Sequence, residues 1–385
     1  MTHLSEIELL DRLVGFDTVS RNPTTAIVAF VTDYLGGLGV ASTILPDETG
    51  RKANLVATIG PAGTPGFVLS GHLDVVPIDG QDWTRSPFKL TREADKLYGR
   101  GTTDMKGFVA CLLSRVPQML AEPLSRPLHL VLSYDEEVGC LGVPGIVRHL
   151  ATTVAPPLAC FVGEPTAMGV VGGHKGSSGF LTIVEGKACH SSRPDLGVNA
   201  IFHAATLIAE LRRMAEELKA VPDAGSPFEL PYTTVSVGVI DGGTARNAIP
   251  GDVAFQWDIR ATKAGMVEAL MRRFATYAAD RVVPAMRAGF AAAKVTTTMV
   301  YDVPPLLPDP GSMAETLAKR FAGRNRTETV NYGSEAGIFQ LAGIPTVLCG
   351  PGRDSEAHIT DEWIDVGELA RCLSFLDEVI AEAQT

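Results

Sequence analysis

Four short apolar runs of the sequence each lead into residues of the types that bind metal ions. The runs and the residues that follow them are Phe67 to Ser70 with His72 and Asp74, Leu128 to Ser133 with Glu136 and Glu137, Leu158 to Val162 with Glu164, and Thr346 to Leu348 with the loop of His358. A further carboxylate, Asp104, lies in the segment GRGTTDMKG (99–107). We expect it at the start of a helix over 104–120, where the helix dipole favours a negative charge.

The side chains of this set indicate which metal ions they could hold. Two imidazoles (His72 and His358) and three carboxylates (Asp104, Glu137 and Glu164) suit zinc, cobalt or manganese, and the lack of thiolates disfavours a structural zinc site. Three carboxylates and one hydroxide carry four negative charges. They match two divalent ions if one carboxylate and the hydroxide bridge the ions. The pattern therefore predicts a pair of ions.

Each residue also has a simpler explanation when taken alone. The pair His72 and Asp74 could be an ordinary surface or core histidine beside an acid, although the acid could also orient a metal-bound imidazole. Glu136 and Glu137 could form a solvated acidic patch, Glu164 could belong to a turn, and His358 to a surface loop. Their shared position after apolar runs favours the metal site.

Other catalytic arrangements find less support in the sequence. The motifs G-x-S-x-G, H-E-x-x-H and G-x-x-x-x-G-K-[ST] are absent, and no G-x-G-x-x-G follows a predicted strand. Cys189-His190 could suggest a thiol nucleophile, but adjacency along the chain does not show pairing in space. A metal-assisted reaction remains the better interpretation.

The elements that must position the candidate ligands have the pattern of an α/β fold. The apolar runs are rich in β-branched residues and are separated by helical patterns, which is typical of a mostly parallel sheet. In such sheets ligands bind outside the carboxyl ends of the strands. Four runs that are far apart along the chain can therefore bring their ligands to one place.

From about Ser177 the pattern changes to apolar alternation, which indicates a second domain. The predicted elements are a strand at 180–184, a helix at 198–220, strands at 234–240 and 253–259, a helix from 264 to about 282, and a strand at 294–300. This β-α-β-β-α-β order is ferredoxin-like. We therefore expect a large, mostly parallel-sheet catalytic domain formed by 1–175 and 305–385, with an inserted α+β domain at 176–304.

Composition excludes some partners. A formal net charge of −11 over 385 residues leaves no basic face for a nucleic acid. No apolar run reaches the roughly 18 residues that a membrane helix needs. Six scattered cysteines without a C-x-x-C pair indicate reduced thiols, so we expect a cytoplasmic protein.

Several segments resemble the metallopeptidase family that contains acetylornithine deacetylase, succinyl-diaminopimelate desuccinylase, aminoacylase and glutamate carboxypeptidase. They are GHLDVVP (71–77), GRGTTDMKG (99–107), SYDEEVG (133–139), GEPT (163–166), GKACHSS (186–192), GGTARNAIP (242–250) and GPGRDSEAHITDEW (350–363). They span nearly the whole chain in the order of the family. The resemblance implies two divalent ions, zinc or cobalt, and a homodimer whose inserted domain closes over the site and forms the dimer contact.

The resemblance also implies a role for each matching residue. Asp104 would bridge the ions, with His72 and Glu164 on one and Glu137 and His358 on the other, while Glu136 would be the general base and Asp74 would orient His72. The inserted domain would supply His190, Asn247 and Arg260 to the substrate, with His190 reaching the site of the neighbouring protomer. Lys175 would be a substrate contact or simply a hinge lysine. Glu335 is a candidate partner for a substrate amine.

The segment VNYGSEA (330–336), followed by 350–363, looks most like the acetylornithine deacetylase branch. The expected reaction is hydrolysis of a small N-acyl amino acid, with N-acetylornithine giving ornithine and acetate in arginine biosynthesis. The alternatives are another N-acyl amino acid such as succinyl-diaminopimelate, a dipeptide, or a catalytically silent relative that binds metals or ligands.

Overall fold

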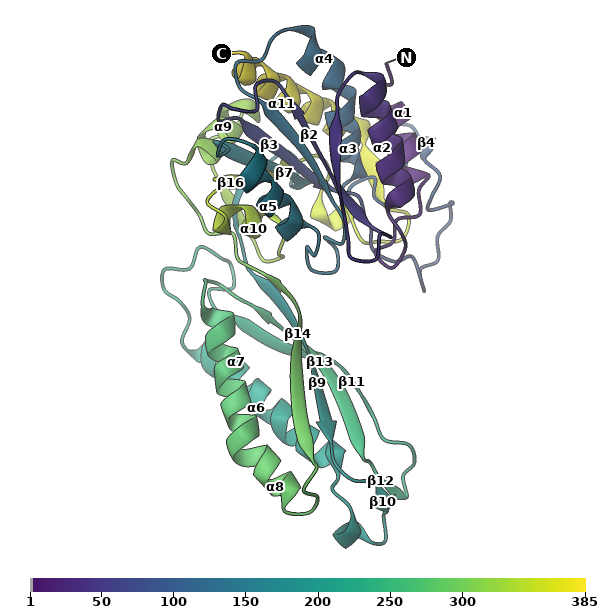
Figure 1. Cartoon of the computed structure of the whole chain (residues 1–385), viewed down its shortest axis with the longest axis vertical. Coiled ribbons are helices and arrows are strands. Elements are labelled where there is room, and N and C mark those ends of the chain that lie inside the picture. Colours follow the sequence, from purple (N-terminus) through teal and green to yellow (C-terminus); the bar gives the residue numbers. More distant parts are fainter. Residues whose placement is uncertain (1–2) are drawn as a thin grey trace. The chain divides into compact units, whose positions relative to one another are not determined.

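The computed structural model describes residues 3–385, which form two compact units (Figure 1). Of the described residues, the larger unit comprises 3–173, 308–329 and 334–385, and the smaller comprises 174–307 and 330–333. These boundaries lie close to those expected from the sequence. They differ in assigning residues 174–175, 305–307 and the short segment 330–333 to the smaller unit.

The larger unit is built on an eight-stranded mixed sheet. Its strand order is β1 (Ser42–Pro46), β2 (Ala53–Ile59), β6 (Leu128–Ser133), β3 (Phe67–His72), β7 (Ala159–Pro165), β16 (Thr346–Gly350), β8 (Val171–His174) and β15 (Glu328–Val330). The central strands β6, β3, β7 and β16 run parallel to one another, whereas β2 and β8 pair antiparallel with their inner neighbours. The predicted, mostly parallel α/β sheet is therefore confirmed.

Helices cover both faces of this sheet (Figure 1). One face packs against α1 (Glu6–Val14), α2 (Thr25–Gly37), α3 (Lys106–Ser114), α9 (Met313–Phe321) and α11 (Val366–Gln384), and the other against α5 (Val143–Thr153) and α10 (Ala336–Leu341). Alternate residues of β6, namely Leu128, Leu130 and Leu132, enter the first of these cores, as the two-residue period of a strand requires. A small sheet of β4 (Thr91–Glu93), β5 (Lys96–Tyr98) and β17 (Trp363–Asp365) completes the unit.

The smaller unit has a four-stranded antiparallel sheet with two helices. Its elements are β9 (Ser177–Glu185), α6 (Ala200–Ala220), β11 (Thr234–Gly242), β13 (Asp252–Arg260), α7 (Met266–Tyr277) and β14 (Lys294–Val303), and the strand order is β11-β13-β9-β14. This is the predicted ferredoxin-like arrangement. Inward-facing side chains of β9 and β13 form its core, where Phe180 stacks on Trp257 with ring centroids 4.4 Å apart.

The helix predicted over 104–120 is shorter and broken in the structure. Helix α3 begins at Lys106, after a cis peptide bond between Asp104 and Met105, and a separate helix α4 (Val116–Ala121) follows it. The break precedes Pro117, which has no N–H to donate and whose ring clashes with a preceding carbonyl. Asp104 therefore lies in the loop before the helix instead of in its first turn.

The second predicted helix of the smaller unit is longer than expected. It begins at Met266, passes through a π-helical turn over Ala278–Val282 and continues as α8 (Val283–Arg287). Pro284 lies in the first turn of α8, directly after the π-helical turn. Among residues 3–385, no helix is both long enough and apolar enough to cross a membrane.

Candidate functional site

The predicted metal ligands of the larger unit come together at one edge of its sheet. His72 ends β3, Glu137 follows β6, Glu164 lies near the end of β7, and His358 lies in the loop after β16. Because these four strands are parallel, their carboxyl ends meet at the same edge. The fold thereby explains how ligands from distant parts of the chain converge.

Asp104 lies between the two histidines. Its Oδ1 is 2.8 Å from Nε2 of His72, and its Oδ2 is 3.1 Å from Nε2 of His358. His358 Nε2 is also 3.2 Å from the Glu137 carboxylate. Each oxygen of Asp104 thus faces one histidine, as a carboxylate that bridges two metal ions must.

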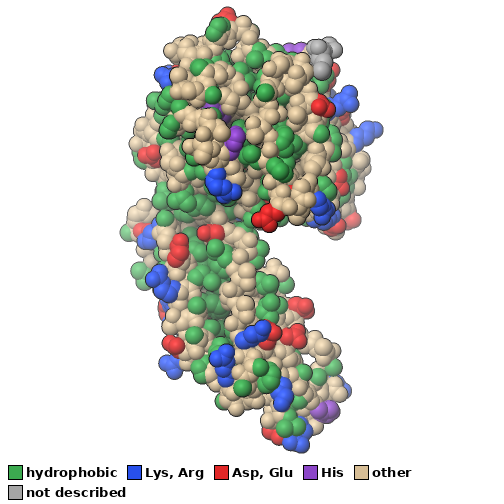
Figure 2. Space-filling model, viewed as in Figure 1, with side chains coloured by type: hydrophobic (Ala, Val, Ile, Leu, Met, Phe, Trp, Pro, Cys, Tyr) green, Lys and Arg blue, Asp and Glu red, His purple; other side chains and the backbone are tan. Residues whose placement is uncertain are grey.

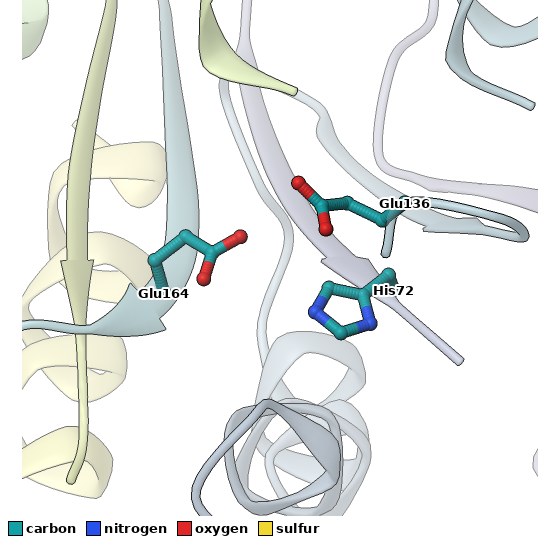
Figure 3. A group of neighbouring side chains, drawn as sticks. All are labelled: His72, Glu136 and Glu164. Carbon is teal, nitrogen blue, oxygen red and sulfur yellow. The ribbon is translucent and has the colours of Figure 1, made fainter. Parts of the chain in front are cut away.

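A second group of ligands surrounds His72. Ligand atoms of His72, Glu136 and Glu164 all lie within 4.8 Å of one another, and so do those of His72, Asp104 and Glu137. Figure 3 shows the carboxylates of Glu136 and Glu164 pointing toward the space beside the His72 ring. The six residues predicted as ligands and base therefore lie in one cluster.

Glycine shapes the loop that carries Asp104. Gly101 has a φ of 84°, in the left-handed region that a β-carbon disfavours, and a β-carbon there would lie 2.7 Å from Cγ1 of Val75. The loop can therefore pass close to the strand end only with glycine at this position.

Asp74 has a different set of contacts from the one we predicted. Nδ1 of His72 lies 2.9 Å from the backbone carbonyl oxygen of Asp74, while the Asp74 carboxylate is 3.7 Å away. That carboxylate instead accepts hydrogen bonds from the backbone N–H groups of Glu136 (3.0 Å) and Glu137 (3.3 Å) and from the hydroxyl of Ser20 (2.7 Å). Its side chain therefore supports the turn that carries the predicted base and one ligand, and its main chain orients the imidazole.

The electrostatics of the cluster indicate that positive charge is missing from it. Burial raises the pKa of Glu136 and of Glu164 well above the ordinary value and that of Glu137 to about 7, because the carboxylates crowd together away from water. Hydrogen bonds to Asp104 and Glu137 raise the pKa of His358 to about 11. Glu164 Oε1 is buried without a hydrogen-bond partner among the described residues. Divalent cations would satisfy both the charge and the unpaired oxygen, so the residues fit two metal ions.

We expect metal removal to lower the stability of the protein. A chelator leaves the buried carboxylates without cations, whereas one ion supplied at a hundredfold its dissociation constant stabilises the folded state by about 2.7 kcal/mol. Thermal unfolding should therefore occur at a higher temperature with zinc or cobalt than with chelator. Glu164→Gln should lose part of this difference. An unfolding temperature that does not depend on the metal would contradict the assignment of the site.

The smaller unit places two predicted substrate residues side by side. His190 lies in a two-residue strand, β10 (Cys189–His190), which pairs with β12 (Ala248–Ile249) and not with the four-stranded sheet. Asn247 directly precedes β12, and its backbone carbonyl accepts a hydrogen bond from the N–H of Ser191. His190 therefore lies outside the strand that we predicted at 180–184. The N–H of Ser192 donates to Nδ1 of His190 (3.1 Å), which places the proton of a neutral imidazole on Nε2. That nitrogen is then a hydrogen-bond donor.

The other predicted substrate residues have protein partners. In the smaller unit, Arg260 Nε donates to Asp258 (2.8 Å), and buried Lys175 donates to the carbonyl of Tyr232 (3.0 Å). In the larger unit, Glu335 is fully buried, and its two oxygens accept hydrogen bonds from the hydroxyls of Ser70 (2.5 Å) and Ser133 (2.7 Å). Glu335 thus links β3 and β6 at residues that shortly precede the predicted ligands His72 and Glu137 along the chain. Its contact with a substrate amine stays a prediction.

Some residues around the cluster had no role in the sequence-based prediction. The Cys140 thiol lies 3.4 Å from Oε1 of Glu136, and Glu362 accepts hydrogen bonds from the backbone N–H groups of Thr103 (2.9 Å) and Asp104 (3.2 Å). Arg100 pairs with Glu362. Arg100 and Glu362 lie within the segments that carry the family resemblance, and Cys140 directly follows one of them, but an isolated charge or thiol gave no local signal of a buried role.

Comparisons with known proteins agree with this geometry. A model of peptidase family M20/M25/M40 matches residues 68–382. Acetylornithine deacetylase of Myxococcus xanthus is 33% identical over 97% of this chain and 96% of its own length, and that of Pasteurella multocida is 32% identical over 95% and 92%.

Solved structures share the fold at lower identity. The M20 family metallo-carboxypeptidase Sso-CP2 of Sulfolobus solfataricus matches with a TM-score of 0.77 and 18% identity over 97% of this chain and 98% of its own. Aminopeptidase PepT of Bacillus cereus matches with a TM-score of 0.73 and 23% identity over the full length of both chains. YXEP of Bacillus subtilis, described as a dinuclear metal binding peptidase, matches with a TM-score of 0.63 and 17% identity over 98% of this chain and 97% of its own.

Proposed function

Because the chain belongs to peptidase family M20/M25/M40, we propose that it hydrolyses the amide bond of a small N-acyl amino acid with the aid of two divalent metal ions. N-acetylornithine is the favoured substrate, with acetate and ornithine as products, because relatives named acetylornithine deacetylase match nearly the whole chain at 31–33% identity. One observation carries the proposal: each oxygen of the Asp104 carboxylate faces one histidine, and three more carboxylates surround them. Such a reaction would belong to arginine biosynthesis.

Amide hydrolysis needs a strong nucleophile, an activated carbonyl and a protonated leaving group. When bound, two divalent ions would lower the pKa of a water molecule and polarise the acyl carbonyl. Glu136 lies in the cluster but outside the expected ligand set, so its carboxylate is free to take the proton of the water and pass it to the departing amine nitrogen. Nε2 of His190 is the expected donor to the oxyanion that develops on the carbonyl oxygen.

The metal ions are expected to be zinc or cobalt. Imidazole nitrogens and carboxylate oxygens form the whole cluster, and both ions accept such a mixed set. His72 and Glu164 would hold one ion, Glu137 and His358 the other, and Asp104 would bridge them. The distances around Asp104 support this division, because His72 and His358 approach different oxygens.

Substrate recognition is assigned to Arg260, Asn247 and Glu335, with Lys175 as a further candidate. A guanidinium can bind a carboxylate through two parallel hydrogen bonds, so Arg260 suits the α-carboxylate of the substrate. To bind it, Arg260 would have to release its present partner, Asp258. Lys175 is buried and donates a hydrogen bond to the carbonyl of Tyr232. These contacts fit a structural role at the hinge as well as they fit a substrate contact.

We expect a panel of N-acetyl amino acids to test both the reaction and its specificity. Protein loaded with zinc or cobalt should release acetate, fastest from N-acetylornithine. Arg260→Lys should lower kcat/KM for every member of the panel, whereas Glu335→Gln should lower it selectively for N-acetylornithine if Glu335 binds the substrate amine. Equal losses across the panel would remove Glu335 from substrate recognition, in keeping with its two serine partners.

The same panel separates the alternative functions. A dipeptide and succinyl-diaminopimelate are added to it for this purpose. Faster hydrolysis of either than of N-acetylornithine would assign the chain to another branch of the family. No release from any member, with both ions bound, would indicate a catalytically silent relative that only binds metals or ligands.

We also propose that the protein is a cytoplasmic homodimer that forms through its smaller unit. Hydrophobic side chains lie along that unit among charged ones (Figure 2). The edge strand β11 exposes Val239 and Ile240, and Phe202 in the first turn of α6 is 71% exposed. An edge strand with exposed apolar side chains is a favourable surface for a second copy. All six cysteines are unpaired, which suits a reducing compartment.

A further inference from the structure

A buried ion pair lies beside the loop that carries Asp104. The guanidinium of Arg100 donates from Nη1 to Oε2 of Glu362 over 2.7 Å, and both side chains are about 1% exposed. Neither residue belongs to the predicted ligands or to the base. Burying two charges is unfavourable unless each has good partners, so the contacts of this pair show what it supports.

The Glu362 side of the pair holds the main chain at Asp104. Its Oε1 accepts hydrogen bonds from the N–H groups of Thr103 (2.9 Å) and Asp104 (3.2 Å). The backbone on both sides adds two further links: Gly99 N–H donates to the carbonyl of Glu362 (2.9 Å), and the Thr103 hydroxyl donates to that of Trp363 (2.6 Å). The loop before the bridging carboxylate is therefore fixed to a segment that lies just after His358.

The Arg100 side of the pair reaches the main chain of His358. Nη2 of Arg100 donates to Oε1 of Gln81 over 2.7 Å, and Nε2 of Gln81 donates to the carbonyl of His358 over 3.2 Å. His358 has a φ of 60°, in the left-handed region that residues with a β-carbon rarely adopt, and its side chain is 51% exposed. Because the His358 side chain is half exposed, few packing contacts hold its backbone in this conformation. The hydrogen bond from Gln81 to the His358 carbonyl is therefore important for keeping it there.

We propose that Arg100, Glu362 and Gln81 form a positioning clamp that sets the distance between Asp104 and His358 and thereby the affinity for divalent metal ions. The clamp joins the backbones of the two ligands, whose atoms Oδ2 of Asp104 and Nε2 of His358 are 3.1 Å apart. The inference rests on the metal centre of the proposed function and assigns residues outside that centre to its assembly. Loss of such supporting hydrogen bonds around metal ligands typically weakens metal binding about 10–100-fold.

The clamp is tested by measuring cobalt binding directly, in the absence of substrate. Competition with a chelator gives the affinity, and the visible absorption of bound cobalt reports the geometry of its ligands. Glu362→Gln keeps the shape of the side chain but removes its charge. Gln81→Ala removes the link to His358 and one hydrogen-bond partner of Arg100, but leaves the contact between Arg100 and Glu362 in place. We expect both variants to bind cobalt at least about tenfold more weakly, with an altered absorption spectrum.

Two further variants separate positioning from plain stability. Arg115 pairs with Asp377 in the same unit (2.6 Å), away from the cluster, so Arg115→Met should keep the cobalt affinity and spectrum of the unaltered protein. The double variant Arg100→Met/Glu362→Leu replaces the ion pair by apolar side chains, which can preserve stability. Its metal-free form should unfold near the temperature of the unaltered protein, while its cobalt affinity should stay low.

The inference is overturned if Gln81→Ala and Glu362→Gln bind cobalt as the unaltered protein does, or if the double variant recovers both stability and affinity. Should Glu362→Gln fail to fold, Gln81→Ala still decides the question, because it leaves the buried pair intact. A protein that binds two cobalt ions but releases no acetate would contradict the proposed reaction and leave the clamp unaffected.

Discussion

Replacing Glu136 by glutamine is expected to lower kcat by about 10²-fold or more while the protein keeps both divalent ions. The amide preserves the size of the side chain but cannot accept a proton from water. Glu136 lies in the cluster, and the N–H groups of Glu136 and Glu137 are fixed by the Asp74 carboxylate, so the substitution should leave the turn in place. Steady-state kinetics and metal analysis of the same preparation would measure both effects.

The neighbouring residue provides the matched control. Glu137 is within 3.2 Å of His358, and we assign it to the metal. Glu137→Gln should therefore lose or weaken one ion, in contrast to Glu136→Gln. If Glu136→Gln loses metal and Glu137→Gln stays active, the two roles are reversed.

Subunit exchange between two inactive variants, His190→Ala and Glu136→Ala, is expected to restore activity. His190 belongs to the smaller unit, whereas every predicted ligand belongs to the larger one. If His190 completes the site of the neighbouring protomer, a mixed dimer contains one site with both native residues, and each heterodimer should have roughly half of the unaltered activity. Loss of one hydrogen-bond donor to the oxyanion lowers kcat about 10²–10³-fold. The activity of the His190→Ala homodimer is therefore low, and recovered activity in the mixed dimers can be measured above it.

The control for this experiment is a demonstration that heterodimers form, for example with two differently tagged chains. Heterodimers without recovered activity would mean that His190 acts within its own chain or has no catalytic role. Mixing either variant with further copies of itself should give no recovery.

Much of the fold followed from local patterns in the sequence. The apolar run at 128–133 has the same bounds as β6, and the helix predicted at 198–220 ends where α6 ends. The ferredoxin-like order could be predicted because strands of period two and helices of period 3.6 alternate clearly there. The convergence of the ligands could be predicted because strands of one parallel sheet end at a common edge.

Contacts between distant residues could not be predicted in this way. The pairing of Arg100 with Glu362 and the bonds from Asp74 to the turn of Glu136 depend on how the loops pack. A charged residue in a loop has the same local pattern whether it is solvated or buried. The pairing of His190 with Ala248 could not be predicted for the same reason, because it joins segments far apart along the chain. The break in the helix over 104–120, in contrast, has a local cause in Pro117.

The place of β16 in the sheet has a consequence for synthesis of the protein in the cell. β16 lies between β7 and β8, but it follows them along the chain only after the whole of the smaller unit's long segment 174–307. A ribosome that adds about 5–20 residues per second needs roughly 7–27 s to synthesise that segment. During this time one edge of β7 stays unpaired, and such an edge readily pairs with another chain. The nascent larger unit therefore has an exposed strand edge at the centre of its sheet during this time, and its predicted ligand His358 is synthesised only after β16.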